Sequence, residues 1–148
     1  MKKYVLHSES VINNIQTYRD YFGDYLHAKI SNYDSLINEL KECPIFTRDI
    51  YQKSIYDIIV SEKNNENALI INGYSIDYLI FKDKFLLKNN PYLILDSAIF
   101  LSKILNIKNI DIILRGYYSE EKNILIKALV ETEDIYYIDR EISINIYD

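Results

Sequence analysis

The sequence predicts an α/β fold in which N-terminal helices are followed by a small, mainly parallel sheet with helices packed on it and a C-terminal edge strand. Apolar residues recur at helical spacing over the first sixty residues. In the second half, short continuous apolar runs, which are typical of buried strands, alternate with helical patterns. Strands separated by helices favour right-handed crossovers and parallel pairing.

The N-terminal part of the chain is predicted to be mainly helical. A first helix begins after a cap at Ser8 or Ser10 and ends at Gly23. A second helix spans residues 33–42 and a third spans residues 48–60, each with apolar residues on one side.

The second part, residues 68–148, is predicted to complete the same single domain as an α/β unit. Its predicted elements are a strand over residues 68–71 that ends at Asn72-Gly73, a helix over 91–105 capped by Asn90, a strand over 110–115, a helix that opens at Ser119, and strands over 135–138 and 142–147. The last strand alternates apolar and polar side chains, which suits a sheet edge.

The composition of the 148 residues excludes several classes of function. Lys and Arg number 17 against 22 Asp and Glu, a formal net charge of -5, so we expect no nucleic-acid partner. Three widely separated glycines cannot form a Walker A or dinucleotide loop, and one cysteine cannot form an intramolecular disulfide. The chain has no apolar run long enough for a membrane span. The acidic residue Glu9 follows the N-terminal lysines too soon for a signal peptide, so we expect a cytoplasmic protein.

Landmark residues of a known family follow one another between Ile71 and Tyr118. They are Asn72-Gly73, Phe81-Lys82-Asp83, Asn90-Pro91, Ile94-Leu95-Asp96 and Leu114-Arg115-Gly116-Tyr117-Tyr118. In order and spacing they resemble the flavin-binding domain of the NADH-oxidising flavoprotein subunit of respiratory complex I and of its hydrogenase and formate dehydrogenase relatives. That family carries V-x-N-G/A-D-E-x-E-P-G-x-F-K-D, then a D-P helix start followed by L-I-E, and a strand ending in I-R-G-E-Y. The resemblance implies that residues 68–148 adopt the flavin-domain fold.

The flavin-contacting parts of the family pattern are changed in this chain. Family members carry a G-R-G-G-A-G-F-P loop, whose glycines let main-chain N–H groups approach the flavin phosphate. The corresponding residues 45–52 contain no glycine. Tyr74 and Ser75 replace an acidic pair, and Tyr78-Leu79 replaces P-G, while Asp77 stands in for one acid. We therefore expect bulky side chains to fill the flavin cavity.

Three residues would hold a cofactor if one is retained. Asn72 follows a buried strand at its carboxyl end, where open α/β sheets usually bind ligands. Asp77 replaces one family acid, and Arg115 ends the next strand, where it can meet an anion. Plainer explanations stay open, because Asn-Gly is common turn chemistry and Arg115 can instead form a salt bridge with Asp77 or Asp83.

Five tyrosines are expected at one rim of the sheet: Tyr74, Tyr78, Tyr92, Tyr117 and Tyr118. A tyrosine-rich rim without a cofactor beneath it suits recognition of a protein. The same rings can instead fill the cavity that holds the flavin in the family, and both interpretations stay open.

The leading hypothesis is a non-catalytic domain without a cofactor that binds a protein partner, either as an accessory subunit or as an inhibitor of a partner enzyme. The alternative is an FMN- or NAD(P)H-binding electron-transfer subunit completed by another chain. No constellation of nucleophile, base and acid stands out, so a stand-alone hydrolase is the least favoured class. The sequence leaves the oligomeric state open.

Overall fold

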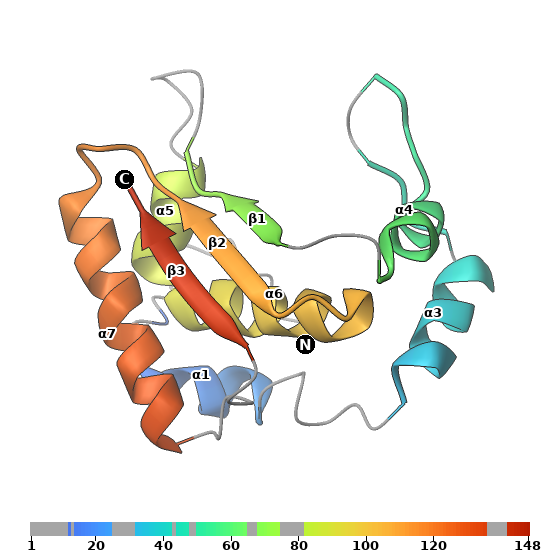
Figure 1. The fold of residues 1–148 in the computed structure, drawn as a ribbon. Coiled ribbons are helices and arrows are strands. Elements are labelled where there is room, and N and C mark those ends of the chain that lie inside the picture. Colours follow the sequence, from blue (N-terminus) through green and yellow to red (C-terminus); the bar gives the residue numbers. More distant parts are fainter. Residues whose placement is uncertain are drawn as a thin grey trace.

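The computed structural model describes residues 12, 14–24, 32–42, 44–47, 50–64, 68–74, 82–135 and 142–148. Three parallel strands form one sheet (Figure 1), in the order β1 (Leu69–Asn72), β2 (Asn109–Ile113) and β3 (Ser143–Tyr147). The predicted α/β class, the parallel pairing and the C-terminal edge strand are confirmed.

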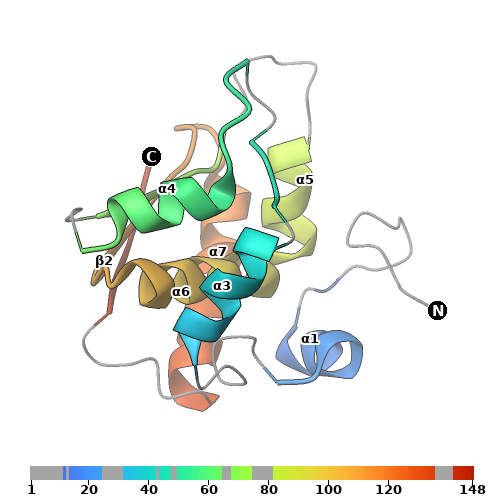
Figure 2. The same ribbon diagram turned by 90° about the vertical axis from the view of Figure 1, so that its right-hand side faces the viewer.

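Three helices cover one face of this sheet (Figures 1 and 2): α5 (Lys82–Asn89), α6 (Pro91–Leu105) and α7 (Ser119–Ile135). The bounds of α6 are those predicted, with Asn90 at the N-cap position. The strand expected over residues 135–138 is wrong at Ile135, because that residue continues α7; residues 136–138 lie outside the described part. The sequence pattern does not predict α5, because Leu87 is its only buried residue.

The strand register divides the side chains of the sheet between two faces. Two rows of apolar side chains point toward the helices, Leu69, Ile110 and Ile144 in one row and Ile71, Ile112 and Ile146 in the next. Ile110 and Ile112 are fully buried in one core cluster with Leu95 and Ile99 of α6. The side chains between these rows point to the opposite face, because successive residues of a strand alternate.

A short helix, α1 (Ile15–Phe22), packs against α6 and α7. The Oδ1 atom of Asn14 caps it by accepting the N–H of Thr17 at 2.9 Å. Gly23 ends it as predicted, with a φ of 75° that favours glycine. Both expected cap residues lie outside the described part, and Ile12, predicted inside the helix, is not helical.

The helix α3 (Tyr33–Glu42) has the predicted bounds, whereas α4 (Ile55–Glu62) begins at Ile55 rather than at residue 48. The chain before α4 forms a loop in which Phe46 and Ser54 make an antiparallel bridge and Gln52 has a φ of 43°. A right-handed helix cannot include that left-handed residue. A second core cluster joins α3 and α4 to the C-terminal part of α6, and its buried members are Ile37, Ile59, Ile104, Leu105 and Ile107.

Candidate functional site

The carboxyl ends of β1 and β2 meet at one edge of the sheet, the edge at which open α/β sheets usually bind ligands. Asn72 ends β1, and its partner in the ladder, Ile113, ends β2. The chain continues from these two residues toward Tyr74 and Arg115. The fold therefore brings predicted cofactor-binding and partner-binding residues together.

Asn72 is engaged in the turn that follows β1. Its Oδ1 atom accepts the N–H of Tyr74 at 3.2 Å, as in an Asx turn. The N–H of Gly73 donates to the carbonyl of Ile113 at 2.8 Å, and a Cβ atom at Gly73 would lie 2.7 Å from Cδ2 of Leu114. The Asn-Gly pair thus closes the end of β1 tightly against β2.

Tyr74, Arg115 and Tyr117 form a cluster that we name the tyrosine–arginine rim. The Nη1 atom of Arg115 donates to the hydroxyl of Tyr117 at 2.7 Å. The guanidinium carbon lies 5.2 Å from the ring centroid of Tyr117 and 5.9 Å from that of Tyr74, which is within the range of cation–π attraction. Tyr117 is 55% exposed and Tyr74 is 37% exposed. The rim therefore presents two aromatic rings held by one cation.

Behind the rim, Tyr118 is buried rather than exposed. Its ring meets Tyr117 edge-on at a centroid distance of 5.0 Å, and Nζ of Lys84 lies 5.4 Å from its centroid. Burial first, and then Tyr117, raises the pKa of the Tyr118 phenol. Nζ of Lys84 also lies 3.6 Å from Oε1 of the buried Glu121. The sequence pattern does not single out Lys84. The signal for Glu121 is its place as an acidic residue in the first turn of α7.

Tyr92 does not lie on the rim, so the expectation of a surface position is wrong for this residue. Its side chain is 1% exposed. The ring packs 6.2 Å from that of Tyr18, centroid to centroid, and the hydroxyl donates to the carboxylate of Glu131. The second residue of α6 points into the core, where α1 and α7 surround it.

Two predicted site residues, Asp77 and Tyr78, lie outside the described part of the chain. Their proposed roles in cofactor binding and partner binding stay predictions. Of the five tyrosines expected at the rim, Tyr74 and Tyr117 are the two that the structure describes as exposed.

The loop over residues 45–52, which the resemblance predicts to correspond to the family's glycine-rich segment, is closed by its own hydrogen bonds. The N–H of Thr47 donates to the carbonyl of Lys53, and the N–H of Ile55 donates to the carbonyl of Ile45, each at 2.8 Å. The N–H of Lys53 donates to Oγ1 of Thr47 at 2.9 Å. These three main-chain donors are occupied within the loop, whereas a phosphate cradle aims its N–H groups at the ligand.

Large apolar side chains also project from this loop. Ile50 is 88% exposed and Tyr51 is 74% exposed, and Ile45 and Phe46 are exposed beside them. A glycine-rich loop would let the backbone approach a ligand closely, which these side chains prevent. The described part of the loop does not fit a flavin phosphate.

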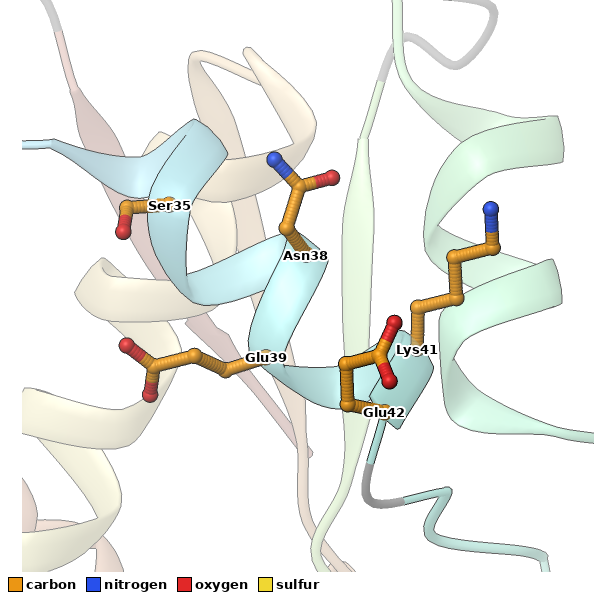
Figure 3. A pocket seen from close by; sticks show the side chains of 5 residues that line it. All are labelled: Ser35, Asn38, Glu39, Lys41 and Glu42. Carbon is orange, nitrogen blue, oxygen red and sulfur yellow. The ribbon is translucent and has the colours of Figure 1, made fainter.

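Two hollows lie on the surface near α3 and α4. One, of about 580 Å³, is lined by exposed polar side chains that fan out from α3 (Figure 3): Ser35, Asn38, Glu39, Lys41 and Glu42. The other, of about 660 Å³, lies between the loop and α4, with Phe46, Tyr51 and Asp57 among its walls. A cofactor pocket buries most of its ligand, whereas all five side chains of the hollow on α3 are exposed.

In the part of the chain that the structure describes, no group of three or more His, Cys, Asp or Glu side chains could hold a metal ion. No helix among these residues is long and apolar enough to cross a membrane.

Comparison with known families identifies the family of this chain. A family model described as the Nuo51 FMN-binding domain matches residues 57–146. Because that match covers more than half of the chain, the chain belongs to this family, and the resemblance inferred from the landmark residues is confirmed. A search of curated proteins found no match.

Solved structures also share the fold, and one of them does so over most of the chain. It is the crystal structure of an NAD+-reducing NiFe-hydrogenase in the H2-reduced state, with a TM-score of 0.61 and 19% sequence identity. The likeness covers 78% of this chain and 21% of the hydrogenase chain. This chain therefore spans about a fifth of the length of that protein, and the likeness concerns the fold alone.

Proposed function

We propose that this chain is a non-catalytic member of the Nuo51 family that carries no flavin and binds a protein partner through the tyrosine–arginine rim. The observation that carries the proposal is the exposed pair of rings, Tyr74 and Tyr117, arranged around Arg115. Tyrosine and arginine are enriched at the hot spots of protein interfaces. Since a hydrogen bond already holds Arg115 to Tyr117, less side-chain entropy is lost when a partner binds.

The loop before α4 supports the absence of a flavin. Three of its main-chain donors bond within the loop, and the exposed Ile50 stands where the family pattern has a glycine. A flavin phosphate would therefore have to displace existing bonds before it found donors.

A partner that is itself an enzyme subunit fits best. The hydrogenase relative carries this fold as about a fifth of a longer chain, so in that protein the fold lies beside other parts of an enzyme. The chain then acts as an accessory subunit or as an inhibitor. Adding the purified chain to the partner separates these roles, because an accessory subunit raises the partner's activity and an inhibitor lowers it.

Binding of FMN or NAD(P)H, completed by another chain, is the second candidate, and the family match favours it. Its ligands in this chain would be Asn72, Asp77 and Arg115. Titration of the purified chain with FMN and with NADH decides between the candidates. We expect no flavin absorbance and no rise in melting temperature; a rise that Arg115→Ala abolishes would overturn the flavin-free proposal.

The rim itself is tested by quantitative co-purification from the source cells. Tyr117→Ala and Tyr74→Ala should each weaken retention of the partner by about tenfold or more, as expected for hot-spot residues. Tyr51→Ala removes an equally large exposed ring from the loop and serves as the matched control. Equal retention by the rim variants and the control would remove the rim from the proposal.

A further inference from the structure

Among the described residues, the parallel sheet carries helices on one face only. Figures 1 and 2 show α5, α6 and α7 on the same side of the strands, with the other side of β2 and β3 outermost. Parallel sheets occur almost only with both faces covered. The uncovered side of this sheet is mixed, with Ile70, Ile113 and Tyr147 set among polar side chains.

We name this surface the open sheet face. Its side chains form three rows, Asn109–Ser143, Ile70–Asp111–Asn145 and Asn72–Ile113–Tyr147. Ile70 is 62% exposed and Tyr147 is 51% exposed, while Ile113 between the two outer strands is partly exposed. Each strand thus contributes one large apolar side chain that points away from the core.

Asp111 lies in the middle of this face and is the one charged residue in the three strands. Its Oδ1 atom accepts the Nδ2 group of Asn145 at 3.0 Å. Anything that covers the face removes water from this carboxylate, which is costly unless a cation or further donors replace the water. The occupant of the face must therefore bring a positive charge to Asp111.

This charge argues against a second copy of the chain as the occupant. Asp111 is in the centre of the middle strand, so two faces packed about a two-fold axis would bring two carboxylates together. Like charges without a cation between them are destabilising at a desolvated interface.

The dimensions of the face match one helix. Three strands spaced about 4.8 Å apart span roughly 10 Å between the outer strands, close to the diameter of an α-helix with its side chains. We propose that the open sheet face docks one amphipathic helix of another protein, with aliphatic residues against Ile70, Ile113 and Tyr147 and a Lys or Arg against Asp111. This surface is distinct from the tyrosine–arginine rim, and the proposal stands whether or not the rim binds a partner.

The test uses the full chain and two designed 20-residue helical peptides (about 30 Å long). The peptides share one apolar face of Leu and Ala and differ at its centre, where one carries Lys and the other Glu. Fluorescence anisotropy should show the Lys peptide binding the wild type about tenfold more tightly than the Glu peptide. In Asp111→Lys the preference should reverse.

A second variant keeps the test decisive if Asp111→Lys does not fold. Asp111→Asn has almost the same shape and removes the charge, so it should bind both peptides equally. Ile70→Ala should weaken both peptides, whereas Ile126→Ala, an exposed apolar position on α7, should weaken neither. Failure of both peptides to bind, binding that ignores Asp111, or a wild-type dimer in light scattering that Ile70→Ala dissociates would each overturn the proposal.

Discussion

At the scale of single residues, one polar contact in the core joins a carboxylate to a phenol. Asp96 of α6 is 2% exposed, and its Oδ2 atom accepts the hydroxyl of Tyr18 at 2.5 Å. Burial, and then the charge of Asp96, raises the pKa of the nearby Tyr33 phenol. Because a buried carboxylate is costly without donors, this bond ties α1 to α6.

Replacing Tyr18 by Phe should lower the free energy of unfolding by about 1–3 kcal/mol, since it removes a donor from a buried charged acceptor. Urea denaturation measures this change. Tyr147→Phe, which removes a hydroxyl from an exposed ring, should change stability by less than about 0.5 kcal/mol. Equal effects of the two substitutions would contradict the role given to the contact.

Two surface ion pairs predict how stability depends on pH. Nζ of Lys88 lies 2.6 Å from Oε1 of Glu120, and Nζ of Lys122 lies 2.6 Å from Oδ1 of Asp148. The hydrogen bond from Lys88 lowers the pKa of Glu120 from its ordinary 4.5, and the one from Lys122 lowers the pKa of Asp148 from 3.8.

A carboxylate with a lowered pKa in the folded state stabilises the fold above its unfolded pKa, and this contribution is lost as pH falls through the folded pKa. Glu120→Gln should therefore lower the melting temperature at pH 7, by an amount that shrinks steadily below about pH 4.5. High salt should reduce the same difference. Thermal melts from pH 7 to pH 2, with Glu39→Gln on α3 as control, measure it; a pH-independent difference would contradict the assignment.

At the scale of secondary-structure elements, the contact between β1 and β2 depends on a glycine just beyond β1. An added Cβ atom at Gly73 would lie 2.7 Å from Cδ2 of Leu114 and 3.0 Å from the carbonyl oxygen of Ile113. The second of these atoms belongs to the backbone of β2 and cannot rotate away. Gly73 thus allows the close approach of two strands, in addition to forming a turn.

Gly73→Ala should therefore cost about 1–3 kcal/mol of unfolding free energy through overpacking. Gly116→Ala is the matched control, because a Cβ atom there meets nothing within 4 Å. It should be close to neutral in the same chemical denaturation experiment. A Gly73→Ala variant as stable as Gly116→Ala would show that the strands can separate without cost.

At the scale of the whole molecule, α6 connects two apolar clusters. Its first part, with Leu95 and Ile99, packs under the sheet, and its last part, with Ile104 and Leu105, packs against α3 and α4. The helices next to the glycine-free loop are therefore attached to the sheet mainly through the C-terminal turns of α6.

Ile104→Ala and Leu95→Ala should each cost about 2–5 kcal/mol, because both side chains are almost completely buried. Their local effects should differ. In native-state hydrogen exchange, Ile104→Ala should reduce protection in α3 and α4 more than in β2, and Leu95→Ala should do the reverse. Uniform loss of protection in both variants would show that the two clusters unfold as one.

Elements marked by strong local signals could be predicted closely. Residues 33–42 and 91–105 form helices with the expected bounds, and the alternation of Ile142 to Tyr147 forms the expected edge strand. Local spacing and a Pro in the first helical turn are sufficient signals, because they act within a few residues. α4 begins late, because the bridge between Phe46 and Ser54 and the left-handed Gln52 replace the expected first turns.

The candidate site could likewise be predicted only in part from the sequence. The sequence already implies that Asn72, Tyr74 and Arg115 lie close together. They follow parallel strands, and the carboxyl ends of such strands share one edge of the sheet. Which tyrosines reach solvent does not follow, because exposure depends on neighbours from distant segments. Tyr92 turns toward Tyr18 and Glu131 in the core, whereas Tyr117 turns outward to Arg115. The family and the class of fold could thus be inferred from local residue patterns, while burial, the closed loop and the open sheet face depend on packing between segments far apart in the chain.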